Sequence, residues 1–182
     1  GQGFDGFVAT WYDQSGNSRN ATQATTTAQP QIVASGALML DARGNTAVDF
    51  LTISNISLKA TWGILTGSAA STIIGVYGET DTSDQDVISW GSATATELAG
   101  LGSLVGVFRS VIAADQNSSV SALSTTGLVA NYFDGTGNAD NTKLYVNGTK
   151  DPAGAATATT QNTTSTDLFI GTRSTGSSDY DG

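Results

Sequence analysis

Short apolar runs of strand length divide this sequence, and clusters of Gly, Asn, Asp, Ser and Thr separate them. Many such runs in succession are typical of antiparallel sandwiches and barrels. We expect strands at residues 7–12, 31–33, 47–50, 71–77, 86–90, 104–110, 128–133, 143–146 and 167–170. Helix signals are weak, and residues 97–104 predict one helical turn at most. The sequence therefore predicts an all-β fold.

The clearest local signal is Lys143-Leu144-Tyr145-Val146 followed by Asn147-Gly148. Asn-Gly accepts positive φ at both central positions of a turn, so it favours a two-residue type I′ hairpin. Successive strand residues point to opposite faces of a sheet. Leu144 and Val146 should therefore face the core, and Tyr145 should face outward.

Length and composition bound the organisation of the chain. Its 182 residues suit one domain over residues 1–182, and only 13% of them are charged, compared with about 25% in typical domains. There is no Cys and no His, so disulfides are excluded, catalysis with an imidazole base is excluded, and zinc sites are disfavoured. The net charge of −9 disfavours nucleic acid as a partner. No apolar stretch is long enough to predict membrane insertion.

Several strings then resemble a known family. Trp11-Tyr12-Asp13-Gln14-Ser15-Gly16-Asn17, with Ala21-Thr22-Gln23-Ala24 and Gln29-Pro30-Gln31-Ile32-Val33, resembles the opening of the arabinofuranosidase B-type domain of the concanavalin A-like lectin/glucanase superfamily. Lys143 to Gly148 and Leu168-Phe169-Ile170-Gly171 are similar to the late hairpin and following strand of laminin G-like modules in that superfamily. The resemblance covers nearly the whole chain. It implies a two-sheet antiparallel jelly-roll sandwich, a fold that hosts lectins, glycosidases, adhesion domains and phage or bacterial surface proteins.

The resemblance also bears on the two ends of the chain. Relatives carry a further strand before the Phe7 region and another after a motif like Tyr180-Asp181-Gly182. We therefore expect this chain to be a segment of a longer protein. The rest of that protein, or a neighbouring subunit, would complete the outer strands.

The acidic residues offer the main candidates for catalysis or metal binding. Glycosidases need two facing carboxyl groups, and Glu79-Thr80-Asp81 is the nearest approach to alternating acids, with Asp84 and Asp86 following and Glu97 as the second glutamate. A solvated loop is the favoured interpretation of this run, a calcium loop comes second, and a catalytic pair comes third.

Asp134, Asn138 and Asp140 are interpreted as a loop, because Tyr145 stands where a calcium loop needs a bidentate acid. The string 13–17 predicts a turn capped by Asp13 or Asn17.

Exposed aromatic rings would mark a sugar-binding surface. Trp11, Trp62 and Trp90 lie in or beside apolar runs, which favours the core for all three, and Trp62 is the best candidate for exposure. The sequence assigns no catalytic, cofactor-binding or metal-ligating residue. Whether the chain is an enzyme is left open, with a non-enzymatic role favoured.

Three functions follow as hypotheses. The first is a structural or adhesion module of a virion appendage or bacterial surface protein, extracellular and able to bind a cell-surface glycan. The second is a glycoside hydrolase acting on arabinose-containing polysaccharide. The third is a calcium-dependent lectin built around residues 79–86, with calcium as its cofactor.

Overall fold

The fold was obtained as a computed structural model, which describes residues 3–50, 56–63, 66–80, 82, 85–91, 98–112, 114–136, 142–155, 162–163 and 167–172. Almost every regular element in these residues is a strand, and every pairing between strands is antiparallel. The single helical turn described is the 3-10 helix η1 (Thr26–Ala28). No helix in these ranges has the length and apolarity to cross a membrane.

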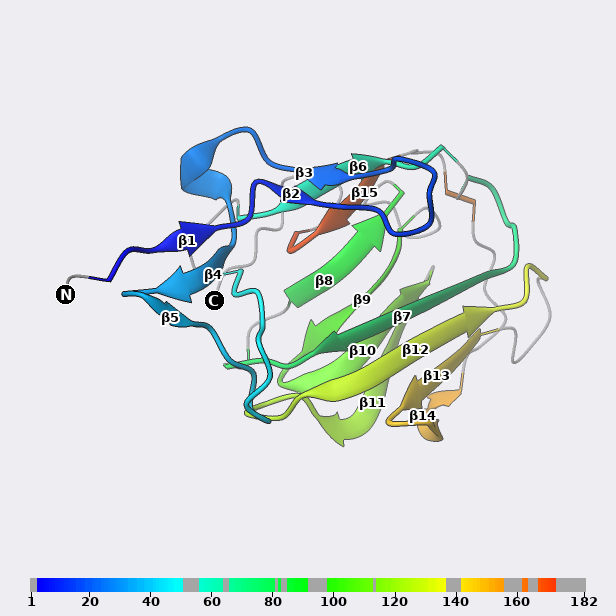
Figure 1. Cartoon of the computed structure of the whole chain (residues 1–182). Helices are drawn as coiled ribbons and strands as arrows, with labels where there is room; N and C mark the ends of the chain where they lie inside the picture. Colours follow the sequence, from blue (N-terminus) through cyan, green and yellow to red (C-terminus); the bar gives the residue numbers. More distant parts are fainter. Residues whose placement is uncertain are drawn as a thin grey trace.

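The larger sheet has eight strands in the order β11-β10-β9-β8-β15-β6-β3-β2. In that order the strands are β11 (Ala114–Ser121), β10 (Val107–Ile112), β9 (Ala99–Leu104), β8 (Gln85–Trp90), β15 (Asp167–Ile170), β6 (Leu58–Thr61), β3 (Ala21–Thr22) and β2 (Thr10–Trp11). The last described strand, β15, therefore lies in the middle of the sheet, between β6 and β8 (Figure 1).

The smaller sheet has four strands in the order β14-β13-β12-β7. These are β14 (Thr149–Ala155), β13 (Thr142–Val146), β12 (Gly127–Phe133) and β7 (Ser71–Tyr77). In Figure 1, β12, β13 and β14 lie at the bottom of the molecule, whereas β2, β3 and β6 of the larger sheet lie at the top. A third, small sheet of β1 (Gly6–Phe7), β4 (Gln31–Ala34) and β5 (Ala37–Leu38) stands at the end that carries the N-terminus.

The apolar core fills the space between the two main sheets. The smaller sheet contributes Ile73, Tyr77, Val129, Phe133, Leu144 and Val146, and the larger sheet contributes Trp90, Ala99, Leu101, Phe108 and Leu168. Tyr77 and Phe108 meet edge to face across the sheets, with ring centroids 5.3 Å apart. At one side Asp151 on β14 accepts hydrogen bonds from the hydroxyl of Ser118 and the backbone N–H of Ser119 on β11. The prediction of an all-β antiparallel sandwich is confirmed.

Where apolar and polar residues alternate clearly, the sequence predicted the strands accurately. The expected strand at residues 71–77 matches β7, and the hairpin at Asn147-Gly148 forms with φ of 52° and 80° at the two turn residues. Leu144 and Val146 are buried as predicted, while Tyr145 is half-buried on the outer face. The prediction of a single domain over residues 1–182 stays a prediction.

Other predictions of local structure were wrong. Residues 104–110 do not form one strand, because Val105 and Gly106 turn with positive φ between β9 and β10. Residues 99–104, where the sequence allowed at most one helical turn, form the unpredicted strand β9, in which Ala99 to Ser103 pair with strands on both sides and Leu104 pairs with Val107 of β10. Residues 7–12 are split between two sheets as β1 and β2, and residues 47–50 form only an isolated bridge through Asp49.

Candidate functional site

The acidic residues between positions 79 and 86 were the first candidates that the sequence offered for catalysis or calcium binding. Glu79 is only 5% exposed, and its backbone bridges to Leu123. Asp86 on β8 is also buried, and its carboxylate contacts the Arg109 guanidinium at 2.6 Å. Asp86 and Arg109 both pair with Gly102 of β9 in the sheet register, so their side chains meet across a position without a side chain.

The solvated-loop interpretation is therefore wrong for Glu79 and Asp86, because both side chains are buried against neighbouring strands. Asp81, Asp84 and Glu97 lie outside the described residues. Within the described ranges there is no group of three or more acidic, His or Cys side chains that could hold a metal ion. Calcium binding by this run stays a prediction.

Asp134 fits the predicted loop. Its Oδ1 accepts hydrogen bonds from the backbone N–H and the hydroxyl of Thr136, at 2.7 and 2.6 Å. These bonds lower the pKa of Asp134 below the usual value for an aspartate. Asn138 and Asp140 lie outside the described residues.

The three tryptophans have different environments. Trp90 is buried in the core as predicted. Trp62 is half-buried and packs against the core, as favoured for all three, so only its ranking as the best candidate for exposure was wrong. Trp11 was expected in the core and is 48% exposed, because β2 is a two-residue strand at the edge of its sheet.

Residues 13–17, which belong to the first string of the family resemblance, form a loop that Asp13 orders. The Asp13 carboxylate accepts hydrogen bonds from the backbone N–H of Ser15 (2.8 Å), the Ser15 hydroxyl (2.8 Å) and the backbone N–H of Arg19 (3.0 Å). Its own N–H donates to Oδ1 of Asn20 at 2.9 Å. The bonds from Ser15 and Arg19 lower the pKa of Asp13 to about 2. The predicted Asp13 turn is confirmed, and it sets the positions of residues 18–20.

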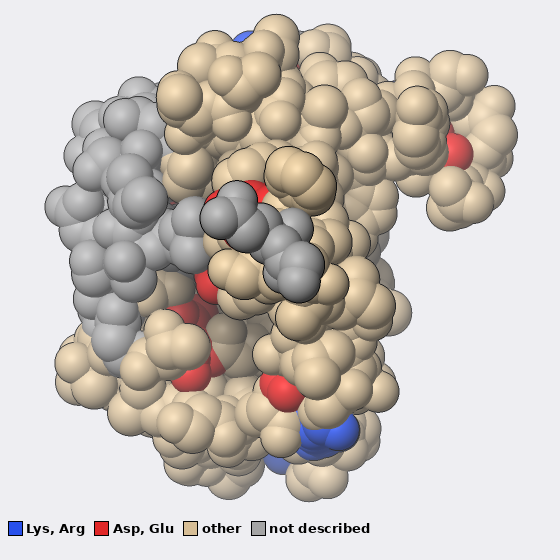
Figure 2. Space-filling view, turned by 60° about the vertical axis from the view of Figure 1, so that its left-hand side comes forward, with Lys and Arg blue, Asp and Glu red and all other residues tan. Residues whose placement is uncertain are grey.

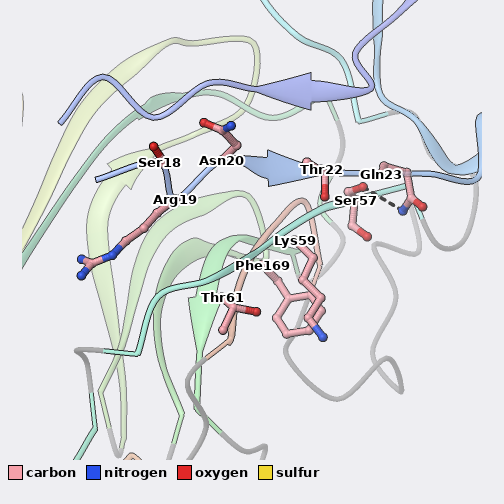
Figure 3. Close-up of a pocket in the computed structure, with 9 residues that line it drawn as sticks. All are labelled: Ser18, Arg19, Asn20, Thr22, Gln23, Ser57, Lys59, Thr61 and Phe169. Carbon is pink, nitrogen blue, oxygen red and sulfur yellow. Dashed lines mark hydrogen bonds between the residues drawn. The ribbon is translucent and has the colours of Figure 1, made fainter. Parts of the chain in front are cut away.

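Residues 18–20 form one wall of a groove on the outer face of the larger sheet. Leu58, Ala60 and Leu168 pack in the core, so the alternate residues Lys59, Thr61 and Phe169 point away from it. The register places Thr22, Lys59 and Phe169 in one row across β3, β6 and β15. The groove has a volume of about 570 Å³. Its lining residues are Ser18, Arg19, Asn20, Thr22, Gln23, Ser57, Lys59, Thr61 and Phe169 (Figure 3).

The floor of the groove combines an aromatic ring with an ion pair. Lys59 Nζ lies 2.7 Å from Asp167 Oδ2 and 5.5 Å from the centre of the Phe169 ring. The Thr61 hydroxyl donates to Asp167 Oδ1 at 2.9 Å. The bonds from Lys59 and Thr61 lower the pKa of Asp167, so its carboxylate stays ionised beside the ring. Lys59 and Phe169 lie side by side in the groove (Figure 3).

Several polar groups in the groove remain available. The Gln23 amide donates to the Ser57 carbonyl at 3.0 Å, the contact drawn as a dashed line in Figure 3. By contrast, within the described part of the chain the Thr22 hydroxyl, the Asn20 side-chain NH₂ and the Arg19 guanidinium make no hydrogen bond to protein. Thr22 is exposed, so its hydroxyl can donate to a ligand and accept from one.

The outer face of the smaller sheet carries a second hollow, of about 390 Å³, with a different character. Ile74, Val76, Leu128 and Tyr132 are exposed there. This surface is mainly apolar and offers a ligand few hydrogen bonds. Figure 2 shows another face of the molecule, where acidic groups lie in a recess and basic groups are few, in keeping with the net charge of −9.

Sequence reasoning did not identify this groove as a site. Thr22 and Gln23 appeared only in the strings that carry the family resemblance, and Lys59 and Thr61 had no role. Phe169 was placed on an expected strand without a role. The available signal was the alternation in Leu168-Phe169-Ile170, which puts an aromatic ring on the face opposite a buried leucine.

Comparison with known proteins identifies no family for the chain. No family model matches the sequence. No curated protein matches it either. Among solved structures, the chain is similar to domain 4 of AbnA, an extracellular GH43 arabinanase from Geobacillus stearothermophilus, solved in complex with arabinotriose. The identity is 12%, the match covers 94% of this chain and 75% of that one, and the TM-score is 0.45. A likeness of this degree carries no argument about function.

Proposed function

We propose that this chain is a glycan-binding β-sandwich module, and that the groove over β3, β6 and β15 is its ligand site. The observation that carries the proposal is the composition of the groove. Six uncharged hydrogen-bonding side chains and two cations surround one aromatic ring, in a space of about 570 Å³. Pockets for small ligands commonly have volumes of about 300–1,000 Å³.

The chemistry of a sugar matches this lining. A pyranose or furanose ring has an apolar C–H surface that can lie on an aromatic side chain, and its hydroxyls both donate and accept hydrogen bonds. Phe169 is half-buried and keeps part of its ring accessible beside Lys59. Thr22 and Asn20 line the groove from the neighbouring strand and loop, and they supply groups that hydroxyls can pair with.

The proposal is for binding rather than hydrolysis. A glycosidase needs two carboxyl groups, about 5–5.5 Å or about 6.5–9.5 Å apart, on either side of the scissile bond. The residues that line the groove in the described part of the chain include no carboxylate. The nearby Asp167 carboxylate is held by Lys59 and Thr61. We extend the proposal to an adhesion role in an extracellular, virion or cell-surface setting, which the family resemblance supports.

Phe169→Ala provides the test of the site. The protein would be titrated calorimetrically with arabinan and xylan oligosaccharides, and we expect about tenfold or greater loss of affinity in the variant. Phe7→Ala is the matched control, because it removes the same ring from an exposed position on β1 outside the groove. Chromatography of the same mixtures would reveal any hydrolysis.

The outcomes separate the rival functions. Equal weakening by Phe7→Ala and Phe169→Ala, or no binding by any oligosaccharide, would reject the groove as a glycan site. Release of shorter sugars would favour the glycoside hydrolase instead. Binding that disappears with EDTA and returns with calcium would favour the calcium-dependent lectin.

A further inference from the structure

We infer that the groove selects an oligosaccharide bearing a carboxylate, a single uronic acid on an otherwise neutral chain, and that Arg19 recognises this group. The inference rests on the proposed function, because it names the ligand class of the same groove. It starts from the distribution of charge. The chain has seven Lys and Arg against sixteen Asp and Glu, and two of those seven cations, Arg19 and Lys59, line this one groove.

The two cations are in different states. Lys59 is neutralised by Asp167, with Nζ and Oδ2 2.7 Å apart. The Arg19 guanidinium has no carboxylate partner among the described residues, although acids outnumber bases more than twofold in the sequence. An unneutralised guanidinium at the wall of a polar groove leaves one positive charge for a ligand to pair with.

The backbone holds Arg19 in place without using its side chain. Its N–H donates to Asp13 Oδ2 at 3.0 Å, and its neighbour Asn20 is fixed by the Asp13 N–H at 2.9 Å. In Figure 3 the side chain extends from the loop in the direction away from Lys59 and Phe169, so its guanidinium marks the far end of the groove. A sugar over Phe169 would therefore leave Lys59 paired with Asp167, and the substituent that meets Arg19 would be carried by a neighbouring residue of the same oligosaccharide.

A guanidinium pairs best with a planar carboxylate, through two parallel N–H···O bonds. The rest of the ligand should be neutral, because a protein of net charge −9 repels a polyanion at long range. These two conditions together describe an occasional uronic acid on a neutral polysaccharide rather than a fully charged polymer.

The test compares two probes, xylotriose and the same triose carrying one glucuronic acid, by calorimetric titration alongside the neutral oligosaccharide panel. We expect the acidic probe to bind about three- to tenfold more tightly than the neutral one. In Arg19→Gln this ratio should fall to about one, while the backbone bond to Asp13 is retained. Arg43→Gln, which makes the same charge change on an exposed turn outside the groove, should keep the ratio.

Each outcome has one meaning. Equal affinity for the two probes, or a ratio that survives Arg19→Gln, overturns the inference about Arg19. The proposed function stands in that case if any neutral sugar of the panel binds in a manner that depends on Phe169. Absence of binding by every sugar overturns both. A triose carrying a sulfate ester in place of the uronic acid extends the comparison, and tighter binding of the sulfate would overturn the carboxylate assignment.

Discussion

Asp13 is the residue on which the groove wall depends. One carboxylate accepts three hydrogen bonds from Ser15 and Arg19, which holds the loop in a single shape. A charged acceptor makes such bonds stronger than neutral ones. The side chain is accessible to solvent, so its main effect is to position the loop rather than to stabilise the whole fold.

The pKa of about 2 makes this dependence measurable. The carboxyl has a lower pKa in the folded chain than the usual 3.8, so its contribution is complete above pH 3.8 and is lost as the pH falls through about 2. We expect the amide resonances of Ser15 and Arg19 to titrate with a midpoint near pH 2. Asp13→Asn should abolish this transition and weaken glycan binding at neutral pH. A midpoint near 3.8 would contradict the hydrogen-bonded loop.

Strand β15 separates stability from binding within two adjacent residues. Leu168 is 3% exposed and packs in the core, whereas Phe169 lies in the groove on the other face. We expect Leu168→Ala to lower the free energy of unfolding by about 2–5 kcal/mol without abolishing glycan binding by the folded fraction. Phe169→Ala should show the reverse, with binding lost and stability changed by about 1 kcal/mol or less. Chemical denaturation and titration of both variants would check this. Equal stability losses would show that the two faces are assigned incorrectly.

Strand β9 depends on a glycine for close approach rather than for turning. A Cβ at Gly102 would lie 1.9 Å from the backbone oxygen of Gln85, and this position separates Asp86 from Arg109 in the register. Gly102→Ala should therefore prevent folding or destabilise the chain severely, as measured by circular dichroism and thermal unfolding.

Gly148→Ala is the matched control for that variant. Gly148 has φ of +80° at the hairpin turn, and a Cβ added there would have no atom within 4 Å. Its substitution should cost only the strain of the left-handed conformation, about 1 kcal/mol. A Gly102→Ala variant as stable as this control would mean that the strands are spaced more widely than described.

The success of prediction from sequence differed between these elements. Strand β7 and the hairpin at Asn147-Gly148 were predictable, because each carries its alternation or turn signal within a few residues. Strand β11 (Ala114–Ser121) was missed because its residues are mainly polar and show no apolar alternation. The groove was missed for another reason. Thr22, Lys59 and Phe169 are neighbours only through strand pairing, so no local pattern marks them as one site.

The whole molecule is assembled through contacts between distant parts of the sequence. β15 pairs with β6 on one side and with β8 on the other, so the larger sheet is continuous only when the last described strand is inserted. The groove exists only when this sheet is assembled, so a ligand binds the folded chain and not the unfolded one. It should therefore raise the unfolding temperature, with about 2.7 kcal/mol of stabilisation at a ligand concentration about 100 times Kd. Differential scanning calorimetry at increasing oligosaccharide concentration would measure this, and an unchanged melting temperature at saturation would contradict it.

The groove draws its walls and floor from three separate segments of the sequence, residues 18–23, residues 57–61 and Phe169. A ligand bound in the groove would consequently link those three segments to one another by reversible, noncovalent contacts. Tension on a bound glycan would fall on neighbouring strands linked edge to edge as well as on the loop of residues 18–20. The grip of the module and its resistance to being pulled apart would then increase together.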